Sequence, residues 1–167
     1  LEKLQDKLPA FNTEKAKTII EKEIGSKSFK DILFLSEPVA AASIAQVHFA
    51  KIKIGKEEKE LAIKILRPNI KTLVNEELDA LMFLAYLVES IFKSTKRLKL
   101  VEVISLLKEI TNVEMDLRFE AAAAGELREN TLNDKGIKVP KIYWNYTSKK
   151  ILTLDKIDGI SIREIEK

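Results

Sequence analysis

Two neighbouring stretches with the residue pattern of strands restrict the fold of this chain more than any other feature. Residues 35–54 are small or β-branched, and apolar and polar side chains alternate from Ile44 onward. Residues 61–66 form a second such stretch, and a polar segment that begins with Gly55 separates the two. Alternation is typical of a strand with one buried face, and a short loop that contains glycine favours a hairpin. The sequence therefore predicts an antiparallel β-hairpin with a loop at 55–59.

A helix is predicted before this hairpin. Residues 12–24 place apolar side chains at helical spacing, Asn12 or Thr13 can cap the first turn, and Gly25 can end the helix. A short helical turn is expected next, at 28–33.

Two long helical stretches are predicted after the hairpin. Pro68 suits the start of the first, because a missing N–H costs nothing in a first turn. This stretch covers 69–92, and a short polar break at 94–98 follows it. The second covers 101–133, with a bend near 111–112, where helix propensity falls.

The last third of the chain has strand character again. Strands are predicted at 137–146 and 150–157, with a turn at 147–149 between them. The glycine of 158–159 breaks the second strand, and Ser161 can cap a following helix. Hairpins on either side of helices predict an α+β fold with an antiparallel sheet.

Composition excludes several classes of function. The chain has 167 residues, which suits one domain, and its 29 basic and 26 acidic residues are evenly mixed and give a net charge of only +3. That balance argues against a nucleic-acid surface, so no nucleic-acid partner is predicted. The absence of cysteine excludes disulfides and thiolate metal sites, and His48, the only histidine, cannot build a zinc site alone.

No transmembrane helix is predicted. The longest apolar run, 78–92, is interrupted by Asp79 and Glu89, and it is too short and too charged to span a bilayer. The helix at 69–92 lacks the Lys/Arg-rich polar face of a membrane-surface helix, which favours packing in the core. Because the chain begins with Leu1 and shows no signal-peptide pattern, we expect it to be a piece of a longer one.

The alanine-rich segment 38–47 is the first of several that could carry chemistry. Its four alanines and Ser43 leave backbone N–H groups uncovered at a turn between strands, so it could lie over phosphates as glycine-rich loops do. The alternative is a tightly packed strand of small residues, which the absence of glycine favours.

Lys64, flanked by apolar residues in a predicted strand, lies twenty-one residues beyond Ser43. Such a lysine is either an outward-facing charge or an ammonium that contacts phosphates and pairs with a helix glutamate. The strand that runs into the glycine break at 158–159 could likewise recognise adenine through its backbone groups.

An acidic cluster lies in the predicted second long helix. Asp116 and Glu120 are four residues apart and share a helix face, while Glu114 lies off it. Arg118 is expected on another face, so a cation that offsets their repulsion must come from elsewhere in the fold. The alternative is a solvated acidic helix face.

The order and wording of these segments resemble one family, the UbiB (AarF/ADCK-like) atypical kinases. Residues 37–48 are similar to that family's alanine-rich loop, and 64–70 to its strand-lysine segment. Glu114-Met115-Asp116 is similar to its ExD motif, and 139–144 and 157–159 to its closing strands and hinge. The resemblance covers essentially the whole chain.

The resemblance implies a protein-kinase-like N-lobe with family-specific long helices and a missing C-lobe. Residues 1–34 would be part of an N-terminal helical extension. Residues 35–157 would be the N-lobe, with a helical insert at about 68–134, and 158–167 the hinge and the start of the C-lobe.

The resemblance also implies the residues of a nucleotide site. They would be Ala40, Ala41, Ala42, Ser43, Val47, Lys64, Glu120, Leu154, Asp155 and Ile157. In that family Lys64 would bind phosphates with Glu120 as its partner, and Leu154 would be the gatekeeper. The backbone of Asp155 and Ile157 would meet adenine. Glu114 and Asp116 would be a regulatory acidic pair that meets an N-terminal extension.

The implied ligand is ATP or ADP with Mg²⁺. The catalytic-loop residues and the metal-binding aspartate are expected beyond Lys167, so this chain is predicted to hold no catalytic residue and no metal ligand. The implied role is support of ubiquinone biosynthesis, with quinone-biosynthesis proteins or isoprenoid lipids as partners. The implied location is the cytoplasmic face of a bacterial inner membrane or the mitochondrial inner membrane, with peripheral membrane contact. The alternative is a non-catalytic helical interaction or scaffold domain, or the remnant of a split kinase gene.

Overall fold

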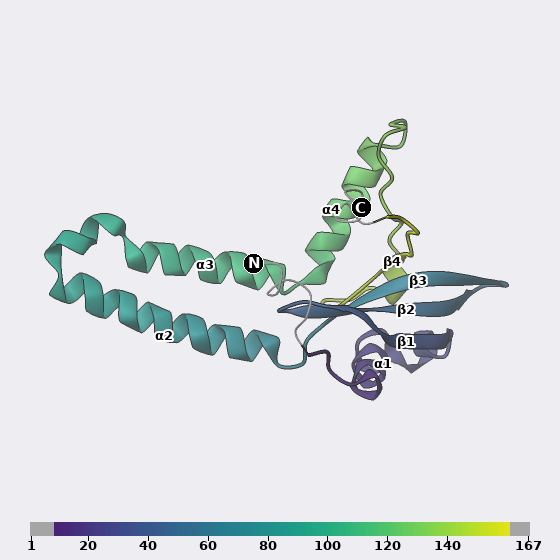
Figure 1. Ribbon diagram of the computed structural model, residues 1–167, viewed down its shortest axis with the longest axis horizontal. Helices are drawn as coiled ribbons and strands as arrows, with labels where there is room; N and C mark the ends of the chain where they lie inside the picture. Colours follow the sequence, from purple (N-terminus) through teal and green to yellow (C-terminus); the bar gives the residue numbers. More distant parts are fainter. Residues whose placement is uncertain (1–8, 161–167) are drawn as a thin grey trace.

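The computed structural model describes residues 9–160, which form a four-stranded antiparallel sheet with helices on both faces and a long helical hairpin projecting from one end (Figure 1). In chain order the elements are α1 (Thr13–Phe29), β1 (Ile32–Ala41), β2 (Ala45–Ile54), β3 (Glu57–Leu66), α2 (Ile70–Ile91), the 3-10 helix η2 (Lys93–Leu98), α3 (Leu100–Glu114), α4 (Leu117–Asn130), the 3-10 helix η3 (Trp144–Tyr146) and β4 (Ile151–Asp155). The predicted α+β class and antiparallel sheet are confirmed.

The sheet has the strand order β1-β2-β3-β4. The predicted hairpin is its centre, but the loop between β2 and β3 has two residues rather than five, because Ile54 already pairs with Glu57. Charge explains the longer strand: the register sets Lys53 opposite Glu58 and Lys51 opposite Glu60. Opposite charges across a pair of strands stabilise the pairing.

One face of the sheet packs on α1. Ile20 of α1 is fully buried against Ile63 and Ile65 of β3 and their neighbours in the first core cluster. Asn12 caps α1 as predicted, because its side chain accepts a hydrogen bond from the Glu14 N–H. The helix breaks at Gly25, where φ is +81°, and one more helical turn runs to Phe29. The helical turn predicted at 28–33 is wrong beyond Phe29, because β1 begins at Ile32.

The other face packs on α4 and the start of α2. Leu117 and Ala121 of α4 are buried with Leu66 of β3 and Leu152 of β4 in a second core cluster. Both faces of the central strands are therefore covered near the middle of the sheet, while the edge of β1 stays open to solvent.

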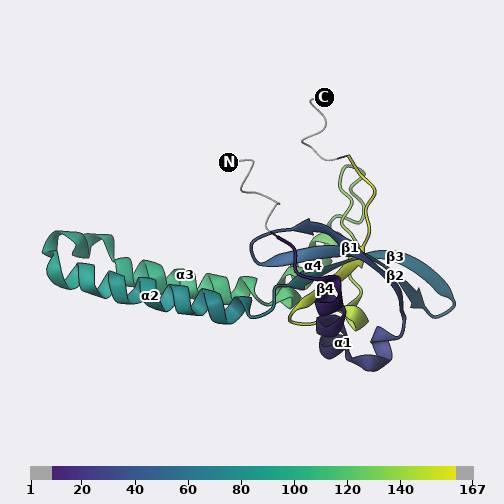
Figure 2. The ribbon, with the colours of Figure 1, turned by 60° about the horizontal axis from the view of Figure 1, so that its bottom comes forward.

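Helices α2 and α3 form an antiparallel hairpin that extends away from the sheet in both views (Figures 1 and 2). Only Leu78 and Ala85 of α2 are buried, and no residue of α3 is. Core packing predicted for the helix at 69–92 is therefore confirmed only for its start, where Ile70 and Val74 pack on the second core, and is wrong for the rest. The helix limits themselves were close, because α2 covers Ile70–Ile91 and η2 occupies the predicted break.

The second long helical stretch breaks later than predicted. Thr111 and Asn112 stay helical, and their side chains donate to the Leu107 and Lys108 carbonyl oxygens of the preceding turn. The break comes at Asp116, whose extended backbone (φ −128°, ψ 94°) places its carboxylate at the first turn of α4. The position of the break is therefore set by the capping side chain of Asp116 and not by the slightly lower helix propensity of Thr111 and Asn112.

The predicted second hairpin is reduced to one strand. The second predicted strand forms as β4. Of the first predicted strand, 137–146, only Ile142 forms a β-bridge to β4, opposite Leu154. Pro140 has no N–H for a longer ladder. Further along, η3 turns the chain so that the Tyr146 hydroxyl, close to the first core, can donate to Asp31. The helix predicted to start at Ser161 lies outside the described residues.

Truncation of one buried and one exposed side chain tests this layering. We expect Ile63→Ala to lower the free energy of unfolding by about 2–5 kcal/mol, because it leaves a cavity between α1 and the sheet. Phe83 on α2 is 70% exposed, so Phe83→Ala should change it by no more than about 0.5 kcal/mol. Urea unfolding followed by circular dichroism measures both, and comparable losses would contradict a solvent-exposed hairpin.

Candidate functional site

A row of four residues crosses the sheet and defines the face on which the candidate site lies. The register aligns Ala40 of β1 with Val47 of β2, Val47 with Lys64 of β3, and Lys64 with Leu152 of β4. Directly paired residues of antiparallel strands project to the same face. The alanine-rich segment, the lysine and the second core are therefore brought to one side of the sheet, opposite α1.

The Lys64 side chain forms an ion pair with Glu120 of α4. Its Nζ lies 2.9 Å from Oε1 and 2.6 Å from Oε2 of the carboxylate, and the two residues are 56 positions apart in the chain. Glu120 is in the first turn of α4, where the helix dipole favours a negative charge. The partner that we assigned to Lys64 from the sequence is therefore the one in contact with it.

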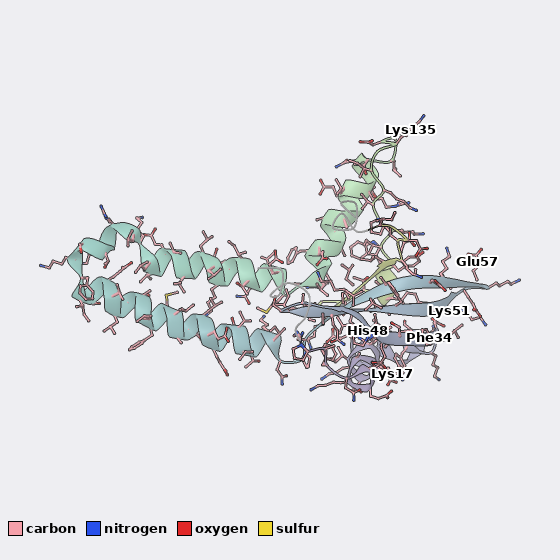
Figure 3. The ribbon with its side chains drawn as sticks, viewed as in Figure 1. Lys17, Phe34, His48, Lys51, Glu57 and Lys135 are labelled. Atoms are coloured by element: carbon pink, nitrogen blue, oxygen red, sulfur yellow. The ribbon has the colours of Figure 1, made fainter. Side chains whose placement is uncertain are left out.

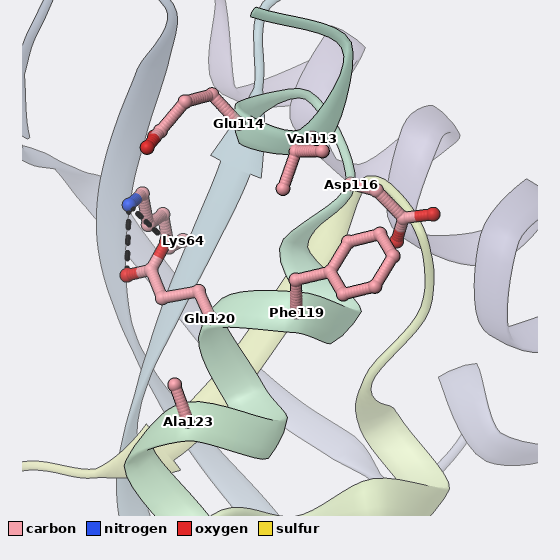
Figure 4. A pocket seen from close by; sticks show the side chains of 7 residues that line it. All are labelled: Lys64, Val113, Glu114, Asp116, Phe119, Glu120 and Ala123. Atoms are coloured by element: carbon pink, nitrogen blue, oxygen red, sulfur yellow. Dashed lines mark hydrogen bonds and ion pairs between the residues drawn. The ribbon is translucent and has the colours of Figure 1, made fainter. Parts of the chain in front are cut away.

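A cavity of about 490 Å³ opens beside this ion pair (Figure 4). Its walls come from β3, the end of α3 and the first two turns of α4, and its lining residues are Lys64, Val113, Glu114, Asp116, Phe119, Glu120 and Ala123. The Glu114 carboxylate points toward the Lys64 ammonium, while Asp116 is turned away beside Phe119 (Figure 4). One ammonium thus stands near two carboxylates at the mouth of the cavity.

Asp116 has a structural role that we did not predict. Its carboxylate accepts hydrogen bonds from the Arg118 backbone N–H and, at 2.9 and 2.7 Å, from the Arg118 guanidinium. These hydrogen bonds hold the pKa of Asp116 below its usual value. The expectation that Arg118 lies on another face is wrong, because Asp116 caps the helix instead of standing within it.

The alanine turn is narrower than the segment that we singled out. Ala40 and Ala41 belong to β1, and only the three residues 42–44 link it to β2. No alanine in this segment has a positive φ, so glycine is not required there. Ser43, in the middle of this turn, is exposed. The turn lies at the end of β1 and β2, beyond the row that contains Lys64.

Arg67 holds this turn through hydrogen bonds to two of its carbonyl oxygens. Its backbone N–H donates to the Ile44 carbonyl oxygen, and its Nε donates to the Ala42 carbonyl oxygen at 2.9 Å. A third hydrogen bond, from Nη1, reaches the Pro9 carbonyl oxygen at 2.9 Å. The turn is therefore tied both to the end of β3 and to the segment that precedes α1.

Two fully buried polar side chains, Gln46 and His48, anchor the same N-terminal segment. The Gln46 amide accepts from the Phe11 N–H at 2.9 Å and donates to the Phe11 carbonyl oxygen at 3.1 Å. It also lies 2.7 Å from Nε2 of His48, whose Nδ1 is 2.7 Å from the Ser36 carbonyl oxygen. Since that carbonyl can only accept, Nδ1 carries the proton and Nε2 accepts from Gln46.

Burial lowers the pKa of His48, against the opposing effects of Ser36 and Glu37. His48 lies on the side of the sheet that α1 covers (Figure 3). We missed Gln46, His48 and Arg67 as site-supporting residues. The available signal was two polar residues at alternate positions of an otherwise apolar strand, since a buried polar group needs a partner.

The hinge expected at the end of β4 is held by Asp155. Its N–H donates to the Lys141 carbonyl oxygen, and its carboxylate accepts from the Lys141 N–H and the Tyr143 hydroxyl. Burial and this carboxylate raise the pKa of Tyr143 to about 12. The N–H of Asp155 is therefore occupied within the protein. Leu154 pairs with Ala62 on the same face as Lys64.

No metal site is present in the part of the chain that the structure describes, since no three potential ligands among histidine, aspartate and glutamate come together there. Nor does any helix within residues 9–160 have the length and apolar character needed to cross a membrane.

Comparison with known proteins matches residues 3–167 to the family described as the ABC1 atypical kinase-like domain. A protein of Marinobacter nauticus named "Probable protein kinase UbiB" is 38% identical over 168 residues, which cover 99% of this chain and 30% of that protein. The proteins of the same name from Histophilus somni and Pseudomonas aeruginosa are 40% and 37% identical, over 98% of this chain in each case. The chain spans about 30% of the length of the relatives it matches.

The buried histidine makes stability depend on pH in a predictable direction. Because the pKa of His48 is lowered in the folded state from 6.5, the unfolded chain binds a proton more readily, and stability falls as the pH drops below about 6.5. The loss is at most about 1.4 kcal/mol per pH unit for one proton.

The matched variant is His48→Gln, which cannot titrate. We expect the free energy of unfolding of the natural chain to fall more steeply than that of the variant between about pH 7.5 and 5.5, measured with urea at each pH. Parallel profiles would show that His48 is not held neutral.

The capping role of Asp116 is tested separately. Asp116→Ala should lower the free energy of unfolding by about 0.5–2 kcal/mol, because the first turn of α4 loses its cap. Asp116→Asn keeps a good capping side chain but loses the bidentate ion pair of the buried carboxylate with Arg118, so it should recover only part of that stability. Equal losses in the two variants would contradict this division.

Proposed function

Because this chain belongs to the ABC1 atypical kinase-like family, we propose that it supplies the nucleotide-binding half of a kinase-like site. The ligand is ATP or ADP with Mg²⁺, bound on the face of the sheet that carries Lys64. The observation that carries this proposal is the Lys64–Glu120 ion pair, which joins the middle strand of the sheet to α4. We keep the proposed domain division, with a helical insert at about 68–134 and with 158–167 as the hinge and the start of the C-lobe, except that the N-lobe begins with β1 at Ile32 and not at residue 35.

The proposed role of Lys64 is to neutralise phosphate. A lysine on this strand, held by a helix glutamate, is the arrangement that protein kinases use for the α- and β-phosphates. Glu120 fixes the direction of the ammonium, and the Lys64 side chain is 29% exposed, so it can still reach a ligand. In this proposal the Lys64 ammonium contacts two groups, the Glu120 carboxylate and a phosphate of the ligand.

The apolar part of the proposed site is the sheet next to Lys64. Val47 is aligned with Lys64, and Ala62 lies two residues before it on the same face. Leu154, the proposed gatekeeper, is paired with Ala62. A purine ring would lie against these side chains, with the Asp155 carbonyl group and the Ile157 backbone at its edge. The alanine turn, with Ser43 at its tip, would lie over the phosphates.

The acidic motif divides into two roles in this proposal. Asp116 is engaged by Arg118, so Glu114 is the member left to face the cavity and to meet an N-terminal extension. With MgATP or MgADP as the ligand, the positive charge of the cation would reduce the repulsion between the phosphates and these carboxylates. The residues present do not form a metal site among themselves, so the proposed contribution of this chain is binding and orientation of the nucleotide.

The wider role is proposed from the family. We place the complete protein among ATP-dependent kinases or ATPases that support ubiquinone biosynthesis, with quinone-biosynthesis proteins or isoprenoid lipids as partners. The proposed location is the cytoplasmic face of a bacterial inner membrane, or the mitochondrial inner membrane. A second candidate, a non-catalytic interaction domain, is favoured by one observation: the α2–α3 hairpin exposes many large apolar side chains.

Binding of nucleotide to matched lysine variants tests the proposal. Lys64→Ala should weaken MgATP binding roughly 10- to 100-fold, as loss of a charge-assisted phosphate contact of about 1.5–3 kcal/mol predicts. Lys59→Ala is the control, because Lys59 is also a half-exposed lysine of β3 with an ion-pair partner, Glu57. Titration calorimetry with MgATP and MgADP measures the dissociation constants, and equal affinities for the natural chain and Lys64→Ala would refute the assignment.

A further inference from the structure

The far end of the α2–α3 hairpin has a composition unlike the rest of the molecule. We define the hairpin tip as residues 90–101, which include the whole of η2. This segment contains four cations, Lys93, Lys96, Arg97 and Lys99, and no aspartate or glutamate. Lys99 is paired with Glu102, and the other three cations have no salt-bridge partner within the described residues. Three of the four acidic residues of α2, Glu76, Glu77 and Asp79, lie in its first half, while Glu89 directly precedes the tip and accepts a hydrogen bond from the Val101 N–H.

Large apolar side chains lie among these cations. Ile91 is 60% exposed, Phe92 55% and Leu98 54%. Behind them, between the two helices, is an open apolar groove of about 180 Å³ lined by Leu81, Leu84, Ala85, Val88, Leu100 and Ile104. Exposed apolar groups that are clustered rather than scattered indicate a contact surface.

The position of the tip restricts what it can contact. Helix α2 has 22 residues, so the tip stands about 33 Å from the sheet. In both views the connection between α2 and α3 lies at the end of the hairpin away from the sheet (Figures 1 and 2). A projecting end whose Lys93, Lys96 and Arg97 have no ion-pair partner among residues 9–160, and which also exposes apolar side chains, suits an anionic, partly apolar surface.

We propose that the hairpin tip docks on an anionic lipid surface, with Phe92, Ile91 and Leu98 entering the headgroup region and Lys93, Lys96 and Arg97 contacting lipid phosphates. Long cationic side chains and aromatic residues are the groups that hold peripheral helices at a bilayer surface. A protein partner would need an acidic surface that matches the arrangement of these side chains, whereas a phosphatidylglycerol-like headgroup layer can adjust to them. The inference does not depend on the nucleotide site.

This contact explains why apolar side chains are retained on a hairpin that buries only two residues of α2 and none of α3. We had expected the helix at 69–92 to lack a membrane role, because its own polar face is not rich in lysine or arginine. The cations are instead supplied by η2, the short break that follows the helix. The amphipathic unit is the folded tip and not either helix alone.

Vesicle sedimentation tests the proposal on the whole chain. We expect binding to phosphatidylcholine vesicles that contain about one third phosphatidylglycerol and much weaker binding to phosphatidylcholine alone, with a decrease as ionic strength rises. The triple variant Lys93→Gln/Lys96→Gln/Arg97→Gln should reduce the partition coefficient roughly 100-fold, at about fivefold for each cation near the surface.

The matched control removes three lysines from the opposite end of the molecule. Lys53→Gln/Lys56→Gln/Lys59→Gln, around the β2–β3 turn, lowers the net charge by the same amount and should leave vesicle binding within about twofold of the natural chain. Equal losses in the two triple variants, or binding that does not depend on phosphatidylglycerol, would overturn the proposal. So would the absence of vesicle binding by the natural chain, as expected if the tip contacts a protein instead.

Fluorescence places the contact at the tip without relying on affinity. Trp144 is the single tryptophan of the chain, so Trp144→Phe with Phe92→Trp creates one reporter at the tip. Its emission should shift to shorter wavelength when anionic vesicles are added, because the indole enters a less polar environment. An unshifted spectrum under conditions where the chain sediments with vesicles would assign the contact to another surface.

Discussion

The ion pair between Lys64 and Glu120 is the interaction on which the proposed site depends. It joins a strand to a helix across 56 residues, and the α2–α3 hairpin lies entirely within that interval. The hairpin can be so long because its two ends return to one place: the N–H of Leu66 donates to the Lys150 carbonyl oxygen, and the N–H of Leu117 donates to that of Lys149. Hydrogen bonds from β3 and α4 to these adjacent carbonyl groups therefore align the sheet with α4 without the help of side chains. The ion pair then fixes the direction of one ammonium and contributes little to stability, as is usual for a pair this exposed.

A second level of support lies at the alanine turn. Arg67 connects the turn to the end of β3 and to Pro9, while Gln46 and His48 hold Phe11 from within the sheet. These contacts join the turn, the sheet and the segment before α1 into one unit. Movement of the N-terminal segment would therefore shift the position of the turn that is proposed to cover phosphate. Such a network works only while His48 is neutral, because a second ring proton would face the Gln46 amide N–H group.

Much of this arrangement could be predicted from local patterns. The hairpin followed from alternation, the Asn12 cap from its position before an apolar periodic stretch, and the limits of α2 from Pro68 and helical spacing. The pairing of Lys64 with Glu120 followed from resemblance to a family and not from spacing. The predictions that failed concern residues with two competing local roles, or contacts between residues far apart in the chain. Asp116 caps a new helix rather than extending the old one, Pro140 shortens the second hairpin, and the partners of Gln46 lie 35 residues away. The exposure of α2 could not be read from its own residues, because periodicity indicates an apolar face but not what covers it.

The central claim is that Lys64 and the face around it form a nucleotide site. It is tested most directly by a crystal structure of this chain with Mg²⁺ and a non-hydrolysable ATP analogue. The predicted result has a phosphate oxygen within about 2.7–2.9 Å of Lys64 Nζ, with Glu120 still in contact with the same ammonium and the purine against Val47, Ala62 and Leu154. An analogue bound at another surface, with no phosphate in reach of Lys64, would contradict the claim.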